Sequence, residues 1–185
     1  MSRIVITGGP GAGKTTLLLA LRARGYTVIG DSPRAIIQDR LRRGLSPRPS
    51  ARDFALETLR MDIENFDQHA ATPGYVFFER GVLDALCGLD LATPLSEHEL
   101  KGWLSKYQYH SKVFVLPAWS AIYVNDAERD HTFEHAEAVN RITKDWYRRC
   151  GYQVIEVPKV PVPERCTYVL DVLANSDAQP LHAGC

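Results

Sequence analysis

The sequence predicts an α/β fold in which a parallel sheet is covered by helices on both faces. Short β-branched or aromatic runs alternate along the chain with longer segments whose apolar residues have helical spacing. Strands separated by helices pair in parallel, because the helix supplies the crossover between them. With 185 residues, of which 45% are hydrophobic, the chain is long enough to bury one substantial core.

In the amino-terminal part, local signals mark two strands and three helices. A β-branched run that ends at a glycine cluster predicts the first strand, and a Leu- and Ala-rich segment stopped by Gly25 predicts the first helix. Ser32 and Pro33 provide a cap and a first-turn proline for the next helix. We expect strands over residues 3–7 and 26–29, and helices over residues 14–24, 32–44 and 52–70.

In the carboxyl-terminal part the alternation continues. Pro73-Gly74 turns the chain into Tyr-Val-Phe-Phe, the strongest strand candidate, and Gly151 ends a long amphipathic segment. We expect strands over residues 75–78, 112–116 and 153–157, and helices over residues 97–106, 132–149 and 164–173. Residues 121–124 fit either a short additional strand or a loop.

Charge and composition argue against several classes of protein. The formal net charge is zero, so the total predicts neither a nucleic-acid nor a membrane-surface ligand. No apolar run approaches the roughly 20 residues of a membrane span. The four cysteines are scattered and indicate reduced thiols in a cytoplasmic protein. We expect a single domain over residues 1–175, followed by a flexible tail over residues 176–185.

A glycine-rich motif follows the first expected strand. Gly8-Gly-Pro-Gly-Ala-Gly13-Lys14-Thr15 fits G-x-x-x-x-G-K-[ST], placed between a strand and a helix. Glycines let successive backbone N–H groups wrap phosphates, and the helix adds its positive dipole end. The motif predicts a nucleotide-binding loop formed by Gly9, Pro10, Gly11, Ala12, Gly13, Lys14, Thr15 and Thr16.

The same loop predicts a donor nucleotide and a metal. Lys14 is expected to reach the β- and γ-phosphates as a catalytic residue, and the Thr15 hydroxyl to bind Mg²⁺. The expected nucleotide is ATP, with GTP as the alternative. Ras-type GTPase motifs and an ABC signature are absent from the sequence, and there is no room for the lid subdomain of a large AAA+ machine. The small kinase layout remains.

Three charged residues follow the second and third expected strands. Glu79 and Arg80 close the third strand, at the sheet edge where ligands bind. Glu79 is expected to hold Mg²⁺, and Arg80 to pair with the transferring phosphate or a substrate anion. Asp31, after the second strand, is placed to act as general base, and Arg34 to contact the acceptor. The alternatives are that Glu79 and Asp31 cap turns or helices and that Arg80 is solvated.

A charged segment after the fourth expected strand predicts a lid over about residues 118–135. It contains Asp-Ala-Glu-Arg129, and Arg129 is expected to close on the phosphates and stabilise transition-state charge. An ordinary surface arginine is the alternative. Trp119 fits either a base-stacking role or packing at the lid hinge.

Several motifs together resemble a family of small AAA-type P-loop ATPase/kinase domains, related to ribosylnicotinamide, thymidylate and deoxynucleoside kinases. They are the glycine-rich loop, Phe-Phe-Glu-Arg-Gly-Val-Leu-Asp, Val-Phe-Val-Leu-Pro-Ala-Trp and Asp-Ala-Glu-Arg, and the likeness spans about residues 3–173. The resemblance implies a three-layer P-loop NTPase fold with five parallel strands in the order 2-3-1-4-5. It also implies that Asp84 lines the acceptor side.

These expectations combine into a function with one alternative. The first hypothesis is Mg-ATP-dependent phosphoryl transfer to a small hydroxyl- or phosphate-bearing acceptor, as in nucleoside and nucleotide kinases. The alternative is a regulatory ATPase or GTPase module that acts through a protein partner. The acceptor itself cannot be read from the sequence, because pocket residues come from variable helices and loops.

Overall fold

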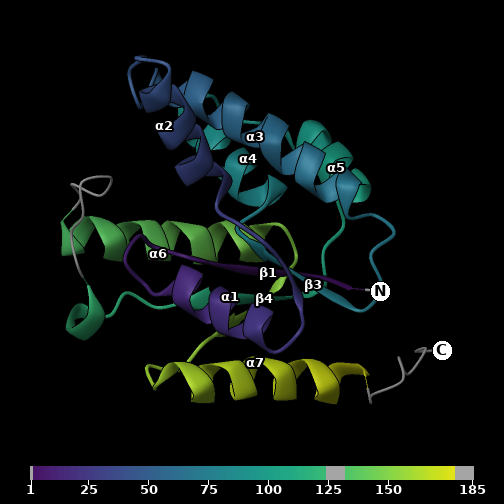
Figure 1. Cartoon of the computed structure of the whole chain (residues 1–185). Helices are drawn as coiled ribbons and strands as arrows, with labels where there is room; N and C mark the ends of the chain where they lie inside the picture. Colours follow the sequence, from purple (N-terminus) through teal and green to yellow (C-terminus); the bar gives the residue numbers. More distant parts are fainter. Residues whose placement is uncertain (1, 124–131, 178–185) are drawn as a thin grey trace.

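The computed structural model describes residues 2–123 and 132–177, and within them five parallel strands form one sheet (Figure 1). The strands are β1 (Ser2–Gly8), β2 (Thr27–Ile29), β3 (Tyr75–Glu79), β4 (Lys112–Leu116) and β5 (Gln153–Glu156). Their order is β2-β3-β1-β4-β5, as the family resemblance implied. In the register Ile6 pairs with both Glu79 and Phe114, so the central strands end near the same level.

Alternate residues of the strands enter two separate apolar layers. On one face Val5, Val76 and Val113 pack under α3 (Ala51–Gln68), α4 (Val82–Ala92), α5 (Glu97–Lys106) and α6 (Phe133–Arg149). On the other face Ile4 and Phe77 pack against α1 (Lys14–Ala23) and α7 (Val162–Asp177). Figure 1 shows the sheet lying between these two groups of helices. A strand buried on both faces must be apolar throughout, which explains the continuous apolar runs.

The expected elements are present, with a few differences. The helix α4 was not expected, because Val-Leu-Asp-Ala-Leu-Cys-Gly-Leu-Asp-Leu-Ala is apolar on nearly every side and lacks helical periodicity. Residues 120–122 form a short 3₁₀ helix, so this part of the 121–124 segment is not a strand. The helix α7 runs to Asp177, beyond its expected end, whereas residues 178–185 and 124–131 lie outside the described residues.

The topology brings four loops to the carboxyl edge of the sheet. These loops follow β1, β2, β3 and β4, and α2 (Ser32–Arg42) starts directly after the second of them. Ligands of open parallel sheets bind at this edge, where the strand order reverses. Among the described residues, no helix combines the length and apolar character needed to cross a bilayer.

Candidate active site

The glycine-rich loop is held tightly between β1 and the helices around it. A Cβ atom on Gly9 would lie 2.4 Å from the carbonyl oxygen of Ala136 in α6, so no larger residue fits there. Gly13 has a φ of 82° and is the N-cap of α1, a left-handed conformation that favours glycine. The loop therefore needs these glycines for packing and backbone shape.

Lys14 lies inside this loop. Its ammonium group donates hydrogen bonds to the carbonyl oxygens of Gly9, at 2.9 Å, and Gly8, at 3.2 Å. The residue is only 5% exposed. A buried ammonium that is held by main-chain carbonyls next to a helix N-terminus is well placed to meet an anionic ligand.

Thr15 and Glu79 place two possible oxygen ligands for a metal beside the loop. The Thr15 hydroxyl lies 3.0 and 3.1 Å from the two carboxylate oxygens of Glu79. Burial raises the pKa of Glu79, and the nearby charge of Asp31 raises it further, while Lys14 and the Thr15 hydrogen bond oppose the shift. A hydroxyl and a carboxylate are hard oxygen ligands of the kind that Mg²⁺ prefers, and a cation would offset the cost of burying the carboxylate. The pair therefore fits the predicted metal role.

Arg80 adopts an unusual backbone conformation at the end of β3. Its φ of 66° is the only positive value for a non-glycine residue in the described part of the chain. Such a conformation costs of order 1–3 kcal/mol and is often found at functional sites. Its N–H donates to the carbonyl oxygen of Ile6, at 3.0 Å, so the turn stays joined to the sheet. The strained turn directs the guanidinium toward two carboxylates.

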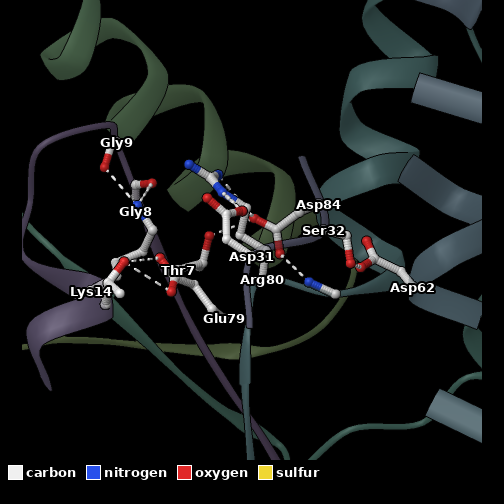
Figure 2. Close-up of polar contacts among 12 residues, drawn as sticks. Thr7, Gly8, Gly9, Lys14, Asp31, Ser32, Asp62, Glu79, Arg80 and Asp84 are labelled. Atoms are coloured by element: carbon white, nitrogen blue, oxygen red, sulfur yellow. Dashed lines mark hydrogen bonds and ion pairs between the residues drawn. The ribbon is translucent and has the colours of Figure 1, made fainter. Parts of the chain in front are cut away.

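These carboxylates are Asp31 and Asp84, which lie beside Arg80 in the centre of Figure 2. Arg80 Nε is 3.5 Å from Asp31 Oδ1, and one of its terminal nitrogens is 3.8 Å from Asp84 Oδ1. Burial alone would lower the pKa of Arg80, but Asp31 and Asp84 reverse the shift and raise it, so the guanidinium stays charged. Asp31 is the N-cap of α2 but makes no side-chain capping bond. Its carboxylate is thus available to the cleft, which disfavours the purely capping alternative.

Asp84 is engaged more fully than Asp31. Its carboxylate accepts hydrogen bonds from the hydroxyls of Thr7, at 2.5 Å, and Tyr147, at 2.6 Å, and from the N–H of Gly81, at 3.1 Å. These donors fix the carboxylate, which in turn faces Arg80. The geometry supports a role in orienting Arg80 more directly than one in contacting an acceptor.

Two adjoining cavities open next to this cluster. The first, of about 260 Å³, is lined by Lys14, Asp31, Arg34 and Arg80 together with apolar residues of α2, α3 and α6. The second, of about 480 Å³, lies between α3, α4 and α6 and is mainly apolar. They share five lining residues, namely Pro33, Phe54, Arg80, His135 and Val139. A small molecule in them would contact the P-loop lysine and the carboxylate cluster at once.

Trp119 and Arg165 lie on the other side of the loop. The Arg165 guanidinium is 5.4 Å from the centre of the Trp119 ring, and the residue is only 5% exposed. One of its terminal nitrogens would lie 3.0 Å from a Cβ atom on Gly13. Burial lowers the pKa of Arg165, and no described carboxylate pairs with it to oppose the shift. A cation and an indole thus meet beside the glycine-rich loop.

Behind Asp31, a buried polar cluster joins α2 to α3. The Ser32 hydroxyl donates to Asp62 Oδ1, at 2.5 Å, and accepts from the side-chain amide of Asn65, at 3.2 Å. Asp62 is 4% exposed, and its second oxygen is buried without a hydrogen-bond partner. Burial raises the pKa of Asp62 from 3.8 to about 7, and the charges of Asp84 and Asp31 add to the shift.

This raised pKa predicts that Asp62 destabilises the fold as the pH rises. Between about pH 4 and pH 7 the folded protein keeps a proton that the unfolded chain has released, so stability falls through this window and levels off above it. Asparagine does not titrate. From pH 5 to pH 7, the Asp62→Asn variant should therefore gain about 2 kcal/mol in unfolding free energy relative to the native protein.

Urea denaturation of both proteins at the two pH values measures this gain. The matched control is Asp67→Asn, which changes an exposed carboxylate of the same helix. It keeps Asp62 and should therefore keep the fall in stability between the two pH values. A constant difference between Asp62→Asn and the native protein would contradict the prediction.

Comparisons with known proteins address the family and the fold of the chain. The sequence matches the AAA domain family over residues 3–165. The chain belongs to the AAA domain family. No curated protein matches the sequence. This AAA domain is therefore a nucleotide-binding P-loop domain.

Solved structures resemble this AAA domain in fold. Deoxyadenosine kinase from M. mycoides with bound dCMP and dCDP has a TM-score of 0.64 at 15% identity, over 94% of this chain and 99% of that one. Shikimate kinase from Acinetobacter baumannii with shikimate has a TM-score of 0.58 at 15% identity, over 97% and 96%. NadR protein in complex with NR has a TM-score of 0.65 at 14% identity, over all of this chain and 54% of that one. This AAA domain therefore has the fold of P-loop kinases.

The structure brings most of the predicted site residues of this AAA domain together. Lys14, Asp31, Arg34 and Arg80 line one cavity, and Thr15 and Glu79 lie beside the loop. Arg129 and much of the predicted lid, residues 124–131, lie outside the described residues. Sequence reasoning missed three residues around this cluster, namely Thr7, Asp62 and Tyr147, and it gave Ser32 only a capping role. It also missed Arg165, which lies beside Trp119.

Proposed function

We propose that this AAA domain catalyses phosphoryl transfer from Mg-ATP to a small acceptor that carries a hydroxyl or a phosphate. One observation carries the proposal: a single cavity is lined both by the P-loop lysine, Lys14, and by the Asp31–Arg80 ion pair. A domain that only bound and hydrolysed nucleotide would need no such cavity beyond the phosphates. The molecules bound in two of the kinase-like structures, dCMP and dCDP in one and shikimate in the other, are consistent with a small acceptor.

The donor side follows from the loop. Main-chain N–H groups of residues 9 and 11–16 hold the phosphates, and Lys14 turns from its two carbonyl partners to the β- and γ-phosphates. Thr15 and Glu79 would hold Mg²⁺, which would neutralise charge on the phosphates. Arg34 lines this cavity and also a hollow beside the loop, which is formed by residues 11–16 and Glu79. It therefore faces the place where the donor phosphate and the acceptor meet.

The transfer step uses the charged cluster. Asp31 accepts the proton of an acceptor hydroxyl, whose oxygen forms a bond to the γ-phosphorus as the bond from phosphorus to the bridging oxygen breaks and ADP leaves. Arg80 stabilises the charge on the transferring group, and Asp84 orients Arg80. We also propose that Arg129, in the lid, stabilises the charge on the transferring group.

The test is ADP release from Mg-ATP, measured for the protein alone and with a panel of nucleosides, nucleotides, sugars and hydroxy acids. Stimulation by one compound, with its phosphorylated product detected by mass spectrometry, would establish the activity and name the acceptor class. A uniform slow rate across the panel would instead favour the regulatory module that acts through a protein partner.

The nucleotide base provides a separate prediction. We expect the base to stack on Trp119 next to Arg165, because this pair lies beside Gly13, on the side of the loop opposite the acceptor cavities. Stacking of a base on an aromatic ring is worth about 1–3 kcal/mol. Trp119→Ala should therefore weaken Mg-ADP binding about 5- to 150-fold, as measured by isothermal titration calorimetry.

Tripolyphosphate, which has the phosphates but no base, is the matched ligand. Its affinity should be the same in the native protein and in Trp119→Ala. If both ligands weaken equally, Trp119 supports the loop rather than the base.

A further inference from the structure

We propose that Ser32 and Asp62 form a positioning pair for the transfer reaction: their hydrogen bond ties the first turn of α2 to α3 and thereby holds the Asp31 carboxylate against Arg80. The inference rests on the proposed function for its catalytic consequence. Figure 2 shows the two side chains pointing toward each other on the side of Asp31 away from Lys14.

The position of Asp31 needs such a device. Asp31 precedes α2 and makes no side-chain capping bond, so the helix start does not fix its side chain. Its contact with Arg80, at 3.5 Å, is an ion pair without hydrogen-bond geometry. Ser32 is the next residue, 1% exposed, and it is the point where α2 is anchored. A displacement of about 1 Å in a reacting group can cost about 100-fold in rate.

The hydrogen bond between Ser32 and Asp62 has a defined direction. Asn65 donates to Ser32 Oγ, so the serine hydroxyl proton points to Asp62. Thr58, one turn away from Asp62 on α3, lines the acceptor-side cavity. Asp62 itself is buried between α2 and α3, and it is not exposed as a ligand. A buried acid with one unpartnered oxygen is expensive to keep, which points to a role beyond packing.

The bond also responds to pH in a way that packing alone would not. Asp62 has a pKa of about 7, set by burial and by the charged groups that face it: Asp84 and Asp31, which raise it, and Arg80, which lowers it. The charge of Asp62 also acts on Tyr109, because it is among the causes that raise the pKa of that tyrosine. An ionised acceptor makes a stronger hydrogen bond than a neutral one. The tether should therefore tighten as Asp62 loses its proton.

The first experiment requires no acceptor. Backbone amide resonances of Asp31, Ser32 and Arg80 are followed by NMR from pH 5.5 to pH 8.5. In the native protein they should shift with a midpoint near the pKa of about 7 of Asp62. In Asp62→Asn this transition should be absent. In Ser32→Ala it should become smaller for Asp31 and Arg80, because only the through-space effect of the Asp62 charge remains. Resonances that do not respond to either variant would overturn the inference, whatever the fate of the proposed function.

The second experiment uses the acceptor found with the panel. Ser32→Ala and Asp62→Ala should each lower kcat about 10- to 100-fold, with Mg-ADP affinity unchanged. Asp62→Asn keeps an oxygen acceptor for Ser32 and should recover most of the loss. The double variant Ser32→Ala/Asp62→Ala should be no worse than either single variant, because both remove one device.

The control is Ser105→Ala, which removes an exposed hydroxyl that donates to the carbonyl oxygen of Gly102 on α5; its kcat should be unchanged. If Asp62→Ala does not fold, Ser32→Ala and Asp62→Asn carry the test. An unchanged kcat in Ser32→Ala would overturn the inference while leaving the kinase assignment in place. If no compound in the panel is an acceptor, the kinase assignment is overturned. The NMR experiment would still test whether the Ser32–Asp62 hydrogen bond positions Asp31.

Discussion

Replacing Lys14 with alanine is expected to lower phosphoryl transfer at least about 1,000-fold, the upper range for removing one preorganised electrostatic donor. The ammonium lies inside the phosphate loop, between the carbonyl oxygens of Gly8 and Gly9. No other lysine lines either cavity or the hollow beside the loop in the described residues. The measurement is the initial rate of ADP release with the acceptor and saturating Mg-ATP.

The structure also predicts that Lys14→Ala folds. The apolar residues of α1 that pack on the sheet, Leu17, Leu18 and Leu21, remain, and the glycines of the loop are untouched. The circular dichroism spectrum should therefore be unchanged. Lys101→Ala removes an exposed lysine of α5 and should keep full activity. Undiminished turnover in Lys14→Ala would contradict the assignment of the loop as the donor site.

The loop was predictable because one short stretch contains both its shape and its chemistry. The glycines, the lysine and the hydroxyl follow one another in the sequence, and the strand and helix that must flank them can be read from local patterns. Asp31, Glu79 and Arg80 could be placed for a related reason. They follow strands, and the ends of parallel strands meet at one edge of the sheet.

The hydrogen bonds that hold the charged cluster of Asp31, Arg80 and Asp84 could not be predicted in this way. Asp84 receives hydrogen bonds from Thr7 and Tyr147, which are 77 and 63 residues away in the sequence. Ser32 and Asp62 are 30 residues apart and lie on different helices. No local pattern links such pairs, because their contact depends on how α2, α3, α4 and α6 pack over the sheet.

Two local features were also hidden from the sequence. The positive φ of Arg80 has no signal in the residue type, since arginine rarely adopts it, and only the packing of the turn imposes it. The resemblance implied that Asp84 lines the acceptor side. It does border the second cavity, but three donors already hold its carboxylate, which only the folded geometry reveals.

The Asp31→Asn variant has the second-largest expected effect, and it also discriminates between acceptor classes. General base catalysis contributes about 100- to 10,000-fold, and asparagine has the same shape but cannot accept the proton. With a hydroxyl acceptor, kcat should fall within that range while Mg-ADP affinity is unchanged, because Lys14, Thr15 and Glu79 are intact. Arg80 keeps Asp84 as its partner, so the cluster should not collapse.

A phosphate acceptor would respond differently to the same change. Its attacking oxygen has no proton to lose at neutral pH, so no general base is needed and kcat should fall much less. The control is Asp39→Asn, which changes a half-exposed carboxylate of α2 that pairs with Arg42 and Arg43. Equal losses of turnover and nucleotide affinity would contradict the base role. Because Asp31 faces the cavity from the strand end and not from the P-loop, the two quantities should separate, and the size of their separation reports which oxygen attacks the phosphorus.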